Sequence, residues 1–117
     1  MTSDNPHALA ITPHAGRVVV LFAGRAVVDT ARALDLAEGA MRPVLYVPRQ
    51  DADMSAFVPT ARHTHCPFKG DASYFTLKVE GREAQNAVWS YETPLPGAAA
   101  IAGHLAFYPD QVEIRHG

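Results

Sequence analysis

The stretch that organises the chain reads Thr64-His65-Cys66-Pro67-Phe68-Lys69-Gly70-Asp71-Ala72-Ser73-Tyr74. Pro67 fixes its own φ and biases Cys66 towards extended backbone, so a helix is not expected there. Gly70 permits a tight turn or a close approach to another group, directly before the strand-like run 72–79. The sequence therefore predicts that a thiol, an ammonium and turn amides converge where a β-strand begins.

Short β-branched and aromatic runs lie on both sides of this stretch, separated by Gly and Pro. This pattern predicts a mostly β, compact single domain of short antiparallel strands with one or two helical turns. The helical turns are expected within 49–59 and 98–102. The strands are expected over 17–22, 26–29, 44–47, 72–79, 86–91, 104–108 and 112–114, with the first two and the last two of these runs paired as hairpins.

The segment 30–38 fits two structures. Thr30 is a suitable cap for a short helix with Ala33, Leu34 and Ala37 on one face. The alternation of side chains along the same segment equally permits a strand. We favour extended backbone because the surrounding pattern is β, and the helix stays open as the alternative.

The composition describes an ordinary globular protein. The chain has 117 residues, 48% hydrophobic and 19% charged, which suits a single core over 17–117 preceded by a polar arm over 1–16. A net charge of −2 provides no basic surface for nucleic acid. A single cysteine fits a reducing compartment, and no signal peptide or membrane-spanning apolar run is apparent. We therefore expect a cytoplasmic protein with no nucleic-acid or membrane partner.

Several short patterns occur together with the stretch 64–70, Ala72 and Tyr74. They are Gly24, Asp29-Thr30, Glu38, Tyr46-Val47-Pro48, Asp51, 87–91, Pro94, 101–103 and 106–108. Together these residues resemble the DUF427 family, a group of small bacterial and fungal domains of unknown function. The resemblance runs from about residue 18 to 114, and it implies a compact, mostly β single domain and no established substrate.

Our first hypothesis is a pocket for a small polar or anionic ligand. Lys69 would supply the positive charge and Gly70 the access to backbone amides. Trp89 and Tyr91 are two residues apart on one expected strand and share a face. Aromatic side chains with polar tips suit the wall of such a pocket. The other residues assigned to it are Cys66, Tyr46, Asp51 and Tyr74. Asp51 is a candidate to orient Lys69 or a tyrosine, and Glu38 is a candidate partner of Lys69 or Arg32.

Two alternatives remain open. In one, the domain is a thiol-dependent enzyme with Cys66 as the nucleophile and Lys69 lowering its pKa, and His63, His65 or His104 is the base. In the other, the domain is a non-catalytic protein-interaction module in which the stretch 64–74 only stabilises a turn. A buried cysteine is also common as a simple packing residue.

No cofactor or metal is expected. In a strand, His63 and His65 share a face while Cys66 points the other way, and no second pair of zinc ligands is evident. Asp51 and Asp53 could hold a divalent ion, but a polar loop with a helix N-cap explains them better. The expected partner is a small molecule, and proline-bounded strand edges leave room for a homodimer paired through a sheet.

Overall fold

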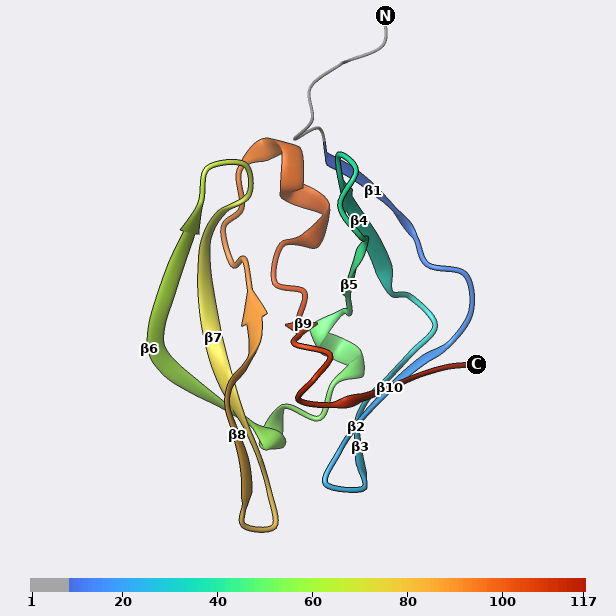
Figure 1. Cartoon of the computed structure of the whole chain (residues 1–117), viewed down its shortest axis with the longest axis vertical. Coiled ribbons are helices and arrows are strands. Elements are labelled where there is room, and N and C mark those ends of the chain that lie inside the picture. The colour runs from blue at the N-terminus through green and yellow to red at the C-terminus, as the bar shows by residue number, and fades with distance from the viewer. Residues whose placement is uncertain (1–8) are drawn as a thin grey trace, which may run out of the picture.

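The stretch 64–74 forms the tip and flanks of a long hairpin in the computed structural model, which describes residues 9–117. The hairpin consists of β6 (Phe57–Cys66) and β7 (Gly70–Val79). It continues into β8 (Arg82–Ser90) and β9 (Ala106–Phe107), giving an antiparallel sheet in the order β6-β7-β8-β9. Figure 1 shows β6, β7 and β8 side by side along one flank of the molecule.

Two smaller antiparallel sheets form the other flank. One has the order β1-β4-β5, with β1 at Leu9–Pro13, β4 at Leu34–Glu38 and β5 at Val44–Tyr46. The other has the order β10-β2-β3, with β10 at Glu113–His116, β2 at Val18–Phe22 and β3 at Arg25–Thr30. An isolated bridge between Val47 and Leu105 joins the two flanks.

Three short 3₁₀ segments lie between strands within residues 9–117, two between β5 and β6 and one between β8 and β9. They are η1 (Arg49–Asp51), η2 (Met54–Ala56) and η3 (Pro96–Ile101). In Figure 1 η3 lies at the upper end of the molecule, between the two flanks. The expected helical turns correspond to η1 and η2 within 49–59, and to η3, which begins slightly before residue 98. In this same range, no helix is long and apolar enough to cross a membrane.

The mostly β, antiparallel prediction is confirmed. The extended interpretation of 30–38 is confirmed for Leu34–Glu38, which is β4. Of the arm expected over 1–16, residues 1–8 lie outside the described part. Leu9–Pro13 pairs with β4 in register from Leu9 opposite Glu38 to Pro13 opposite Leu34.

The predicted hairpin at the C-terminus is wrong. β9 pairs with β8, whereas β10 pairs with β2 in a different sheet. The backbone N–H of Gln111 donates to the Tyr108 carbonyl, and this turn leads the chain from one flank to the other. Two neighbouring strand-like runs form a hairpin only when both join the same sheet. The sequence does not reveal which sheet each run will join.

β6 was not predicted from the sequence. It is an edge strand whose side chains are mostly exposed, with only Phe57 fully buried. Such a strand lacks the regular alternation of apolar and polar residues on which strand prediction depends.

The buried side chains separate into two clusters. The valine-rich cluster contains only Val, Ala, Leu and Phe as its buried members and includes β2, β3 and the lower part of β7 and β8. The tyrosine cluster contains eight buried residues, three of which are tyrosines. Its buried members are Leu36, Tyr46, Ala72, Tyr74, Tyr91, Ala98, Ile101 and Ala106.

Candidate functional site

A cavity of about 280 Å³ opens beside the tyrosine cluster. We call it the lysine cavity. β4, β5, β7 and β8 all contribute to its wall, together with the loop before β5, the β6–β7 turn and the residues just after β8 and β9. Its lining residues are Leu36, Glu38, Met41, Arg42, Val44, Tyr46, Lys69, Tyr74, Trp89, Tyr91 and Tyr108.

An ion pair forms the charged part of the wall. Lys69 Nζ donates to Glu38 Oε1 at 2.6 Å, and the two side chains are only 13% and 15% exposed. The predicted partnership of Glu38 with Lys69 is confirmed. Arg42 adds a second cation, so the charged groups that line the lysine cavity are two cations and one carboxylate. The cavity therefore carries a small excess of positive charge.

The aromatic part of the wall is held by a contact between β5 and β8. Trp89 Nε1 donates to the Tyr46 hydroxyl at 3.2 Å, and the two rings meet edge to face with centroids 6.4 Å apart. Burial raises the pKa of Tyr46 to about 12, and burial also raises the pKa of Tyr91. These phenols stay neutral at physiological pH and can donate or accept a hydrogen bond.

A second pair of phenols, Tyr74 and Tyr108, also lines the cavity. The Tyr74 hydroxyl oxygen lies 3.0 Å from Thr64 Oγ1, and the Arg62 guanidinium lies 4.9 Å from the centre of the Tyr74 ring. Burial tends to raise the pKa of Tyr74, but its hydrogen bonds with Thr64, Tyr108 and Arg62 outweigh this and lower it. The hydrogen bond with Tyr74 raises the pKa of Tyr108. Tyr74 is therefore more acidic than Tyr46 and Tyr91.

Gly70 fixes the position of Lys69 through the backbone. Its φ of +110° is a conformation that residues with a side chain rarely adopt. An added Cβ would lie 3.4 Å from the Leu95 backbone nitrogen, and that same N–H donates to the Lys69 carbonyl at 2.9 Å. The β6–β7 turn therefore packs directly on the segment before η3, and this contact orients Lys69 towards Glu38.

Cys66 lies close to this region but is not among the residues that line the lysine cavity. Its side chain is half-buried and packs against the tyrosine cluster. Of the histidines considered as its base, His65 Nδ1 lies 2.7 Å from Asp71 Oδ1 and His104 Nδ1 lies 3.2 Å from the Ala102 carbonyl. The role of Cys66 as a nucleophile stays a prediction.

Asp51 does not line the lysine cavity either. Its carboxylate accepts hydrogen bonds from Thr30 Oγ1 at 2.7 Å and from Arg32 at 3.1 Å, and these contacts lower its pKa. Asp53 pairs with Arg25 and accepts from the Ser55 backbone N–H, so the N-cap interpretation of Asp53 is confirmed. Among the described residues, no group of three or more His, Cys, Asp or Glu side chains is arranged to hold a metal ion.

The sequence profile of a domain of unknown function, DUF427, matches residues 10–116. The chain belongs to the DUF427 family. A search of curated proteins finds no match to it. The family match includes every residue that lines the lysine cavity, so the cavity is formed entirely within the DUF427 domain.

Sequence reasoning missed several residues that line the lysine cavity of this DUF427 domain. Arg42 and Met41 lie in the loop between β4 and β5, where nothing in the local pattern distinguishes them from surface residues. Tyr108 belonged to the family-like run 106–108, and this was the available signal. Three other arginines, Arg32, Arg49 and Arg62, do not line the cavity.

Proposed function

We propose that this DUF427 domain binds a small polar or anionic molecule in the lysine cavity. Lys69 and Arg42 would contact the anionic or most polar group, and the tyrosine hydroxyls would contact the remaining polar atoms. The observation that carries the proposal is the juxtaposition of a poorly exposed Lys69–Glu38 ion pair with Tyr46, Tyr74, Trp89, Tyr91 and Tyr108 around one cavity.

The energetic cost of building the cavity wall supports this proposal. Removing two charges and several phenols from bulk water is costly unless each finds a partner. A wall made only for stability would be cheaper to build from aliphatic side chains, as in the valine-rich cluster. Polar groups that converge on a largely aromatic cavity are typical of a binding site for a small molecule.

Lys69 can contact a ligand while it stays paired with Glu38. An ammonium has three N–H donors, and one of them is directed to Glu38 Oε1. Glu38 holds the side chain in place while another donor can be offered to a bound anion. A volume of about 280 Å³ lies just below the usual range for ligand pockets, so the ligand is expected to be small.

Lys69→Met tests the proposal, with the fluorescence of Trp89 as the signal because this sole tryptophan lines the cavity. The probes are phosphate, acetate and benzoate, with acetamide and benzamide as neutral counterparts. We expect Lys69→Met to weaken binding of the anions at least tenfold, which corresponds to about 1.4 kcal/mol. An affinity that stays within twofold of the native value for every anion would contradict the proposal.

Two further variants separate binding from folding. Lys78→Met is the matched control, because Lys78 pairs with Glu83 on the exposed surface of β7–β8 at 3.1 Å and lies outside the cavity. It should leave affinity unchanged. Lys69→Met is expected to cost about 2 kcal/mol of unfolding free energy, because it removes an ammonium from a poorly exposed carboxylate. Glu38→Gln combined with Lys69→Met should recover most of that stability without recovering anion binding.

A further inference from the structure

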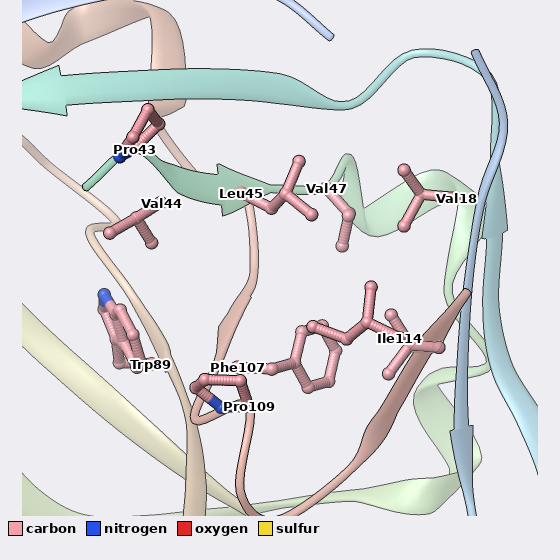
Figure 2. Close-up of a pocket in the computed structure, with 10 residues that line it drawn as sticks. Val18, Pro43, Val44, Leu45, Val47, Trp89, Phe107, Pro109 and Ile114 are labelled. Atoms are coloured by element: carbon pink, nitrogen blue, oxygen red, sulfur yellow. The ribbon is translucent and has the colours of Figure 1, made fainter. Parts of the chain in front are cut away.

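A second cavity, of about 190 Å³, lies against the valine-rich cluster. We call it the apolar cavity. All ten residues that line it are apolar, and Figure 2 shows Val18 and Ile114 at one end of it and Val44 and Trp89 at the other. Protein interiors are normally packed with few voids larger than a water molecule. An apolar void of about 150 Å³ is already large enough to bind benzene.

The apolar cavity reaches the surface. Pro43 and Pro109 lie in its wall and are exposed, and Figure 2 shows Pro43 beside Val44 and Pro109 between Trp89 and Phe107. A molecule can therefore enter from the side on which these prolines lie. Most of the other lining residues lie on β2, β5, β8, β9 and β10.

The apolar cavity and the lysine cavity share a boundary. Val44 and Trp89 line both of them. Two chain segments also pass from one to the other, because Arg42 and Tyr108 line the lysine cavity while their neighbours Pro43 and Pro109 line the apolar cavity. The segments 42–44 and 108–109 and the side chain of Trp89 thus join the polar wall of the lysine cavity to the wall of the apolar cavity.

We infer that the two cavities accommodate one amphiphilic anion, with its carboxylate or phosphate head in the lysine cavity and an alkyl or aryl group in the apolar cavity. This inference rests on the proposed function for the head group. Arg42 lies at the boundary and provides a positive charge beside the point where head and tail join. The size of the apolar cavity limits the tail to a single ring or a short chain.

The test is a homologous series of straight-chain carboxylates from acetate to octanoate, with Trp89 fluorescence as the signal. We expect affinity to rise about three- to fourfold for each added methylene until the cavity is filled, which is the increment for burying a CH₂ group. The 1-alkanols of the same chain lengths serve as neutral partners and should bind at least tenfold more weakly.

Two variants that fill the apolar cavity test whether the alkyl group of the ligand binds there. Ile114→Phe and Leu45→Phe add volume inside the apolar cavity, and neither residue lines the lysine cavity. In both variants the affinity for carboxylates should no longer depend on chain length, while the affinity for acetate should be unchanged. Melting temperatures will verify that both variants fold. Val58→Phe is the control, because Val58 is exposed on β6 and lies outside both cavities.

The outcomes distinguish the inference from the proposed function. If affinity does not depend on chain length, or if both filling variants retain the native dependence, the amphiphile inference is overturned although Lys69→Met still weakens acetate. If alkanols and carboxylates bind equally and Lys69→Met changes neither, the head-group site fails and the proposed function fails with it. Chain-length dependence that is lost in the filling variants, together with a Lys69-dependent preference for carboxylates, supports both.

Discussion

The two buried clusters of this domain share the β6-β7-β8-β9 sheet, yet they are built from different side chains. The valine-rich cluster has no polar side-chain atom among its buried members. The tyrosine cluster contains three of the four tyrosines of the chain and lies beside the Lys69–Glu38 ion pair. The first is a composition that stabilises a fold, whereas the second buries polar groups at a cost that stability alone does not explain.

Each cluster also has its own cavity, and the cavities differ in the same way. The apolar cavity is lined only by apolar residues, whereas the lysine cavity combines aromatic rings with two cations and a carboxylate. Val44 and Trp89 stand between them. From this contrast we expect the valine-rich cluster to contribute more to stability, whereas the proposed binding role belongs to the end of the core that holds the tyrosine cluster.

The largest expected effect is on the valine-rich cluster. Leu77 is fully buried on β7, and Leu77→Ala should lower the free energy of unfolding by about 2 to 5 kcal/mol because it removes contacts and leaves a cavity. Tyr91→Phe in the tyrosine cluster removes only a hydroxyl and should cost about 1 kcal/mol or less. Urea denaturation measures both. Equal losses for the two variants would remove the contrast between the clusters.

A smaller effect is expected from pH. Because the folded pKa of Tyr46 is about 12 and the unfolded value is about 10, the folded chain keeps a proton that the unfolded chain loses between these two pH values. The free energy of unfolding should therefore be insensitive to Tyr46 below pH 10 and fall by about 2 to 3 kcal/mol as the pH rises to 12.

Urea denaturation from pH 8 to 12 measures this dependence. Tyr46→Phe should flatten the decline, since it removes this titrating phenol, while the raised pKa values of Tyr91 and Tyr108 still contribute. An unchanged slope in Tyr46→Phe would show that the buried phenol does not couple to folding.

The smallest expected effect is the difference in stability between two glycine substitutions, one beside the lysine cavity and one in the β7–β8 turn. Gly70 and Gly81 both have positive φ, +110° and +81°, but only Gly70 has neighbours within contact distance of an added Cβ. Gly70→Ala should cost about 2 kcal/mol and Gly81→Ala about 1 kcal/mol, because a φ of +110° lies farther than +81° from the left-handed region that other residues can adopt. Thermal unfolding measures the difference, and a larger loss for Gly81→Ala would contradict it.

The local sequence pattern was sufficient to predict many of the strands and turns. The β-branched run 18–22 and the turn at 23–25 specify a hairpin, and the glycine at position 81 separates β7 from β8. The partners of a strand were not predictable in the same way. β9 and β10 follow each other in the chain but join different sheets, since β9 pairs with β8 and β10 pairs with β2. Each strand pairs where its apolar side chains can pack against the core.

For the candidate site, the sequence by itself determined which side chains carry chemistry and that Lys69 sits at a turn beside a strand. Only the tertiary structure decided that Glu38, 31 residues away, is its partner and that Asp51 instead pairs with Thr30 and Arg32. It also placed Arg42 and Tyr108 in the wall of the lysine cavity. The physical reason is that turns and strands are governed by neighbours along the chain, whereas a cavity is formed by side chains that sheet packing brings together from distant segments.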